Sequence, residues 1–164
     1  MRPFAAFVDA VDPAMVIVTA AAGAERDGCL VGFHAQCSIE PPRYAVWLSV
    51  ANRTCDIAQR SRCLGVHLLG DGDGDLAELF GGETGDEVDK LARCEWVPGP
   101  DGVPLLGRCP TRFVGRVVET VAGVGDHDLF VLDVIDAARG EVSTPLRLST
   151  ARRIEPGHEA TERR

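Results

Sequence analysis

With 164 residues, of which 45% are hydrophobic, the chain is long enough for one domain with a single core. Its net charge of −8 argues against nucleic acid and against an anionic membrane as partners, because both require a basic face on the protein. No run of the sequence approaches the roughly 20 apolar residues that span a bilayer, so we expect a globular protein.

Apolar residues near the N-terminus follow the spacing of one helix face: Phe4, Phe7, Val8 and Val11. Pro13 bars continuation of this helix, so the sequence predicts a short N-terminal helix packed against the body of the protein. Asp9 and Asp12 interrupt the apolar character of the segment, which is therefore not typical of a signal peptide. We expect the chain to stay in the cytoplasm.

Two β-type runs follow, Met15 to Ala20 and Cys29 to His34. They are separated by a segment that ends in Asp27-Gly28, a typical turn dipeptide. The pattern predicts a β-hairpin whose turn segment, residues 21–28, ends at Asp27-Gly28.

The stretch after this hairpin is the most informative part of the chain. Tyr44 to Val50 is predicted to be a buried strand, because the double proline Pro41-Pro42 precedes it and cannot join a ladder of hydrogen bonds. Asn52 and Thr54 then occupy positions typical of helix caps, ahead of a short helix from about Cys55 to Ser61.

A helix start of this kind attracts a phosphate, because its first N–H groups lack partners and carry a partial positive charge. Arg53 would add a full charge beside them. Alternatively, Asn52 and Thr54 only cap a surface helix, and Arg53 is solvated. The residues by themselves leave both interpretations open.

Further along, Arg62 to Leu69 is predicted to be a strand, with His67 as a core or edge histidine whose ring nitrogens are bonded. Asp75 and Glu78 resemble a capping box at the start of a helix that runs through Phe80. The acidic segment from Gly81 to Lys90 is predicted to be the most mobile part of the body of the protein.

The remaining strand predictions are residues 93–97, 113–121 and 128–137, with an edge strand at 146–148. In total the pattern predicts about seven short strands and three short helices without βαβ alternation, which favours a mainly β, antiparallel barrel. We expect one domain over residues 1–150 and a flexible tail over 151–164. No G-x-G-x-x-G motif follows a strand, so a Rossmann nucleotide site is not supported.

Six cysteines are present, and none forms a C-x-x-C pair. Without an export signal, we interpret them as free thiols. His34 with Cys37 is the only pair that suggests a metal site, and a single pair is too few ligands for zinc, so we predict that no metal is bound.

The order of these features resembles the flavin reductase-like family, whose members fold as FMN-binding split β-barrels. The residues that carry the resemblance are Gly32, the segment His34 to Ser38, Glu40-Pro41-Pro42, Asn52-Arg53-Thr54, Leu76-Ala77 with Phe80, Gly102 to Leu106, and Gly125-Asp126-His127. The chain departs from the family between Gly32 and Pro41, where it is shorter, and His34-Ala35-Gln36-Cys37 replaces the usual Thr-Ala-Asn-Ser.

The resemblance implies an antiparallel Greek-key split barrel that binds FMN, with FAD or a deazaflavin as alternatives. By this resemblance the phosphate would lie at Asn52, Arg53 and Thr54. The ring edge would lie against the segment composed of His34, Ala35, Gln36, Cys37 and Ser38. NADH or NADPH would pass a hydride to the flavin, and the family also implies a homodimer.

His127 matches the family position that contacts the nicotinamide and is the candidate catalytic residue. Alternatively, it is a turn histidine bonded to a neighbouring carbonyl. For the whole protein, a second hypothesis is a carrier or sensor that binds a flavin, deazaflavin or haem without oxidising a nicotinamide. The shortened segment after Gly32 motivates it. A third is a structural barrel whose interface is its function.

Overall fold

The computed structural model describes residues 2–141 and 144–157. Within them, the longer helices are α1 (Arg2–Val11), α2 (Arg53–Ala58), α3 (Gly74–Gly82) and α4 (Leu148–Ala151), and the short 3-10 turns are η1 (Leu91–Arg93) and η2 (Pro100–Gly102). The strands are β1 (Val16–Ala22), β2 (Glu25–Val31), β3 (His34–Ser38), β4 (Arg43–Ser49), β5 (Cys63–Leu68), β6 (Trp96–Pro98), β7 (Pro104–Leu106), β8 (Arg112–Val121) and β9 (His127–Ala138).

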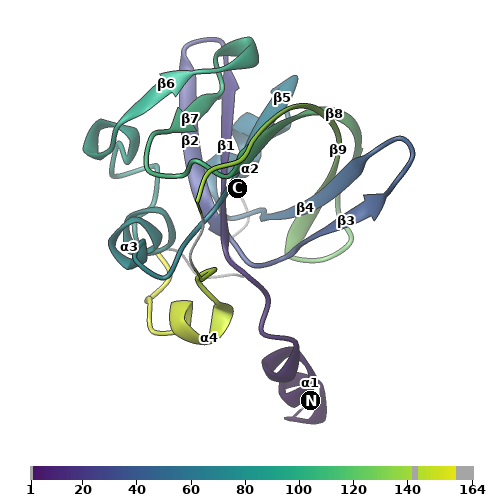
Figure 1. The fold of residues 1–164 in the computed structure, drawn as a ribbon, viewed down its shortest axis with the longest axis vertical. Helices are drawn as coiled ribbons and strands as arrows, with labels where there is room; N and C mark the ends of the chain where they lie inside the picture. Colours follow the sequence, from purple (N-terminus) through teal and green to yellow (C-terminus); the bar gives the residue numbers. More distant parts are fainter. Residues whose placement is uncertain (1, 142–143, 158–164) are drawn as a thin grey trace.

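Seven of these strands form one antiparallel sheet in the order β2-β1-β5-β8-β9-β4-β3. The sheet curls into a half-barrel, and the β3–β4 hairpin lies on the side opposite the small β6–β7 hairpin and α3 (Figure 1). Register shifts in the β8–β9 pair, next to Gly115 and Glu119, provide irregularities of the kind that bend a sheet. The mainly β, antiparallel architecture predicted from the sequence is confirmed.

The two largest of three hydrophobic clusters in the described residues hold this sheet together. The first fills the curve of the sheet and packs α2 against β1 and β2, with Leu48, Ile57 and Phe130 among its fully buried members. The second joins the end of the sheet to α3 and α4 and includes Phe80 and Leu106. The apolar positions of α2 and α3 face these clusters, which explains why such short helices are stable here.

The first hairpin forms as predicted, but its turn is shorter than the predicted segment 21–28. Its turn is at Gly23-Ala24, where Gly23 has the positive φ of +60° that such a turn requires. Asp27 and Gly28 lie inside β2, paired with Ala20 and Thr19. The sequence did not indicate that Asp27 belongs to the strand, because its burial beside Lys90 involves a distant residue that local turn preferences do not report.

The N-terminal helix forms as predicted, but its apolar face is not packed against the barrel. The exposed fractions of Phe4 and Phe7 are 62% and 66%, and α1 has no buried residue. In Figure 1 the helix projects away from the sheet. Polar contacts hold its end, including an ion pair between Asp9 and Arg152. The predicted packing is therefore wrong for the isolated chain.

Two other local predictions are corrected by the structure, and a third is covered only in part by the described residues. Helix α3 begins at Gly74 after Asp73, and Asp75 pairs with Arg108 in place of the expected capping box. The predicted edge strand at 146–148 is reduced to isolated bridges at Pro145 and Arg147, because α4 begins at Leu148. Of the predicted tail, residues 151–157 are described: Ala151 and Ile154 pack on the second cluster, and residues 158–164 lie outside the described residues.

His67 is a core residue, as predicted. Its Nδ1 lies 3.1 Å from the Ile17 carbonyl, and its Nε2 accepts a hydrogen bond from the Leu106 N–H at 3.2 Å. Burial, more than the nearby Arg112, lowers the pKa of His67 to about 4, while its bond to Ile17 opposes the shift. The histidine is therefore neutral at physiological pH and serves the packing of β5.

Candidate functional site

The start of α2 is capped as the sequence predicted. Asn52 has an extended backbone, and its side-chain oxygen accepts a hydrogen bond from the Thr54 N–H at 3.1 Å. The Cys55 N–H donates to the Asn52 carbonyl. The Thr54 side chain is fully buried. These N–H groups are thus used within the turn, and an anion arriving here would depend on Arg53.

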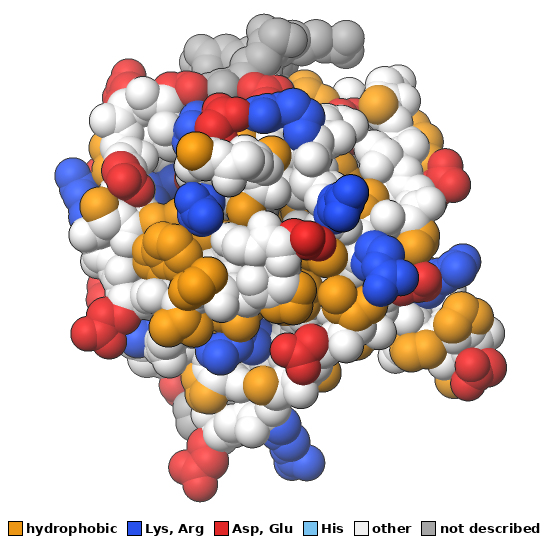
Figure 2. Space-filling view, turned by 90° about the horizontal axis from the view of Figure 1, so that it is seen from above, with side chains coloured by type: hydrophobic (Ala, Val, Ile, Leu, Met, Phe, Trp, Pro, Cys, Tyr) orange, Lys and Arg blue, Asp and Glu red, His pale blue; other side chains and the backbone are white. Residues whose placement is uncertain are grey.

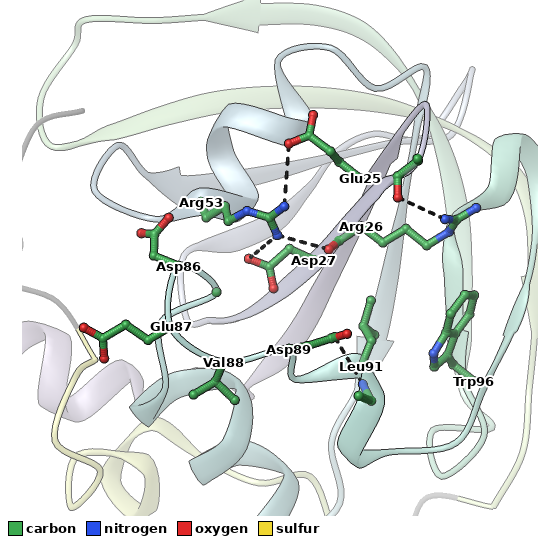
Figure 3. A pocket seen from close by; sticks show the side chains of 13 residues that line it. Glu25, Arg26, Asp27, Arg53, Asp86, Glu87, Val88, Asp89, Leu91 and Trp96 are labelled. Atoms are coloured by element: carbon green, nitrogen blue, oxygen red, sulfur yellow. Dashed lines mark hydrogen bonds and ion pairs between the residues drawn. The ribbon is translucent and has the colours of Figure 1, made fainter.

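Arg53 points from this turn toward β2, where it meets two carboxylates (Figure 3). Its guanidinium lies 3.6 Å from Glu25 and 4.0 Å from Asp27, and it also donates to the Arg26 carbonyl. Both ion pairs are long, and the Arg53 side chain is partly exposed. The charge of Arg53 is therefore balanced loosely, by groups that line a cavity.

That cavity, which we name the acidic cavity, has a volume of about 700 Å³. Its wall comes from β2 and Arg53, and its cover is the segment around Gly85 to Asp89, which carries Asp86 and Glu87 (Figure 3). Across the cavity, Arg26 stacks over the Trp96 ring at 5.7 Å. Carboxylates thus outnumber arginines around this space.

Asp27, which lines the acidic cavity, belongs to a buried ion pair. Lys90 Nζ lies 3.3 Å from Asp27 Oδ1, and both side chains are almost completely buried. Gly85 packs so closely on Asp27 that any side chain at this position would collide with the carboxylate. The Lys90 ammonium also lies 5.7 Å from the Phe80 ring, and Phe80 lines a second cavity.

This second cavity, which we name the apolar cavity, has a volume of about 470 Å³. Its wall includes the end of β2, the face of β4 that carries Trp47 and Ser49, helix α3 and the C-terminal segment. The lining residues are Met15, Cys29, Leu30, Val31, Gly32, Phe33, Trp47, Ser49, Asn52, Phe80, Gly81, His127, Leu148, Ala151, Arg152, Ile154 and Pro156. A mainly apolar wall with a few polar groups is typical of a site for an aromatic ligand.

His127 stands at the edge of the apolar cavity. It is the first residue of β9 and pairs with Ser49 across the sheet. Its ring lies 5.0 Å from the Phe33 ring, and its Nδ1 is 2.7 Å from the Asp126 carboxylate. The hydrogen bond from His127 is the main cause that lowers the pKa of Asp126. The second ring nitrogen, Nε2, is then the one that can contact a ligand.

The predicted ring-edge segment forms β3, at the edge of the sheet. The His34 ring bridges the Tyr44 hydroxyl, 2.6 Å from Nδ1, and the Ala14 carbonyl, 2.7 Å from Nε2. Ala35, Gln36 and Cys37 are exposed, and Ser38 is half-buried. The apolar cavity is lined by Gly32 and Phe33, immediately before this strand. Contact of a flavin with residues 34–38 stays a prediction.

Of the predicted site residues, the structure therefore places Asn52 and His127 together at the apolar cavity, and Arg53 at the acidic cavity. The sequence interpretation missed the C-terminal wall, because residues after 150 have few apolar neighbours in the sequence. It also missed the role of Trp47, although the alternation of Trp47 and Ser49 along β4 places both on one face.

The family model for the flavin reductase like domain matches residues 10–154. The chain belongs to this family. Among curated relatives, it is 32% identical over 131 residues to the FMN reductase (NADH) RutF of Enterobacter cloacae, covering 79% of this chain and 77% of the relative. It is 31% identical over 104 residues to the RutF of Pseudomonas syringae, covering 62% of this chain but only 57% of that relative.

Solved structures of the flavin reductase-like family share the fold. An FMN-binding protein from Thermus thermophilus superposes with a TM-score of 0.73 at 25% identity, over 80% of this chain and 72% of that protein. A flavin reductase domain protein from Arthrobacter gives a TM-score of 0.78 at 22% identity, over 89% of both chains. The split-barrel fold implied by the sequence resemblance is confirmed.

Proposed function

We propose that this chain is a flavin reductase that binds FMN and passes a hydride from NADH to the flavin. The observation that carries the proposal is the apolar cavity, whose volume of about 470 Å³ lies in the usual range of small-molecule sites. Its polar lining residues are Ser49, Asn52, His127 and Arg152. The 32% identity to a relative named FMN reductase (NADH) supports both the flavin and the nicotinamide.

The residues of the apolar cavity fit a flavin. Phe33, Trp47 and Phe80 offer apolar contacts for an isoalloxazine ring, and Ile154 helps to wall the site. The phosphate would lie at the start of α2 and exchange the long contacts of Arg53 with Glu25 and Asp27 for a shorter one. Such an exchange is favourable because phosphate gives Arg stronger, charge-assisted hydrogen bonds.

A bound flavin supplies the hydride-accepting chemistry, and the protein binds and aligns the reactants. The apolar walls of the cavity would shield a flavin ring from water, and His127, which also lines it, would contact the nicotinamide. With Nδ1 held by Asp126, the ring of His127 has one orientation and presents Nε2. Its role would be to orient the second reactant against the flavin.

We also propose a homodimer in the cytoplasm. Exposed apolar side chains support self-association: Phe4 and Phe7 on α1, and Ile39 beside the edge strand β3, which is 84% exposed. None of the helices in the described residues is long and apolar enough to cross a membrane. The six cysteines are free, which agrees with a reducing compartment.

The proposed function is tested by titrating FMN into the purified protein, followed by the fluorescence of the flavin. Replacing Arg53 by alanine should weaken FMN binding by about tenfold or more, equivalent to ~1.4 kcal/mol. Arg60→Ala is the matched control, because Arg60 also pairs with Glu25 but lines neither cavity. If the wild-type protein binds no FMN, the proposal is wrong. If it binds FMN but does not oxidise NADH, the carrier or sensor hypothesis replaces it.

A further inference from the structure

The turn that carries His127 is exposed and needs an anchor. It joins β8 to β9 through residues 122–126, all of which are exposed. One backbone hydrogen bond, from the Val50 N–H to the Asp126 carbonyl at 3.0 Å, ties it to the end of β4. A turn held only in this way would allow the His127 ring to move relative to the apolar cavity.

Asp128 supplies further anchors from the opposite face of the strand. The residue is only 8% exposed, although it carries a carboxylate. Its Oδ1 accepts the Gly123 N–H at 3.2 Å and so closes the turn on itself. Its Oδ2 accepts the Gln59 side-chain amide at 2.8 Å, at the end of α2, and the Cys55 thiol approaches the same oxygen at 3.8 Å.

These bonds connect the two elements that form the site. Helix α2 carries Asn52 and Arg53 at its start, and β9 begins with His127. Because successive residues of a strand point to opposite faces, Asp128 can be held by α2 while the His127 ring stays at the cavity. Burial, and then the neighbouring Asp128, raise the pKa of Cys55 to about 12, so its thiol keeps its proton and remains a donor.

We propose that Asp128 is a positioning residue, which fixes the His127 ring against Phe33 and thereby sets the binding of the nicotinamide. This role rests on the proposed function, in which His127 contacts the nicotinamide. A carboxylate suits the position because donors from the turn and from α2 converge on it: the Gly123 N–H, the Gln59 amide and the Cys55 thiol. An asparagine could still accept from Gly123 and pair with Gln59 after rotation of that amide.

The test compares Asp128→Ala with Asp128→Asn and with Asp133→Ala. Asp133 is the matched control, since it also lies on β9 but pairs with Arg43 at 2.7 Å, away from the cavities. For Asp128→Ala we expect the KM for NADH to rise about tenfold or more, because small misplacements of a contact are costly. The dissociation constant of FMN should change by less than about threefold, equivalent to ~0.6 kcal/mol.

A second readout follows the position of His127 without any turnover. The neighbouring Phe33 ring shifts the NMR signals of the His127 ring protons, assigned with a His127→Ala variant. In Asp128→Ala this shift should be lost, and in Asp128→Asn and Asp133→Ala it should be kept. If Asp128→Ala unfolds, Gln59→Ala removes only the contact to α2 and should give a smaller loss of the same kind.

Unchanged His127 signals in Asp128→Ala, or an equal loss in Asp133→Ala, would overturn the positioning role. A rise in the FMN dissociation constant as large as that in KM would also overturn it, because it would indicate general damage to the site. Failure of the proposed function is a separate result: the wild-type protein would not oxidise NADH, while the NMR comparison would still decide whether Asp128 positions His127.

Discussion

Of the acidic and apolar cavities, the acidic one is the larger, at about 700 Å³ against about 470 Å³. Several of its charged groups have partners: Arg53 makes long contacts with Glu25 and Asp27, and Asp27 pairs with the buried Lys90. The apolar cavity instead offers ring-sized apolar walls, with His127 at its edge. The difference teaches that volume alone does not identify a ligand site. Whether the polar groups around a cavity already have partners within the protein must also be considered.

The comparison predicts first that the buried ion pair of Asp27 and Lys90 serves stability. Replacing Asp27 by alanine leaves the Lys90 ammonium buried without its partner, 3.3 Å away in the wild type. We expect the free energy of unfolding to fall by about 3–5 kcal/mol. Urea unfolding measures this loss, and Glu87→Ala, an exposed carboxylate of the cover, should change stability by less than about 0.5 kcal/mol. Equal losses in the two variants would show that the buried pair has no special role.

His67 provides a reference for a buried polar group outside both cavities. Its pKa is lowered from 6.5 to about 4 by burial, so the unfolded chain binds more protons than the folded chain between these pH values. The free energy of unfolding should therefore fall as the pH drops from 6.5 to about 4, by about 3 kcal/mol from this group. In His67→Gln this part of the pH dependence should disappear. If the wild-type protein and His67→Gln showed the same pH dependence of stability, the lowered pKa of His67 would be contradicted.

The third prediction places the same bulky residue in each cavity. Ser49→Trp fills part of the apolar cavity and should weaken FMN binding about a hundredfold, or ~2.7 kcal/mol. Ala24→Trp places the same side chain at the rim of the acidic cavity and should leave FMN affinity unchanged. Fluorescence titration of FMN gives both values, with circular dichroism to show that each variant is folded. The opposite ranking would move the flavin ring to the acidic cavity.

The surface shows why the overall charge was a poor guide to these sites. On the face drawn in Figure 2, acidic and basic side chains are interspersed, and hydrophobic side chains are exposed between them. The net charge of −8 disfavours extended anionic partners, such as nucleic acid or an anionic membrane. It contains no information about Arg53, whose charge is balanced locally by Glu25 and Asp27.

Features set by nearby residues could be predicted from the sequence. The helix cap at Asn52, the strand before it and the core position of His67 follow from local patterns of polarity and from the prolines ahead of β4. The order of short motifs identified the family, because a set of motifs in sequence is more specific than any one of them.

Features set by distant contacts could not be predicted. The sequence did not place Asp27 and Gly28 in β2, because Asp27 is buried beside Lys90 and no local preference records that pair. The wall formed by Leu148 and Ile154 comes from a segment with little apolar character, which packs only because α3 and the end of β2 offer it a surface. The exposed face of α1 has the pattern of a packed helix, and the pattern does not say what it packs against.

The central claim is that a flavin in the apolar cavity accepts a hydride from NADH. The most direct test is anaerobic stopped-flow mixing of the FMN-loaded protein with NADH, recording the visible absorbance band of the flavin. We predict that this band bleaches at a rate that saturates with NADH, and that Ser49→Trp shows no saturable bleaching. A band that remains unchanged in the wild-type protein would contradict the account.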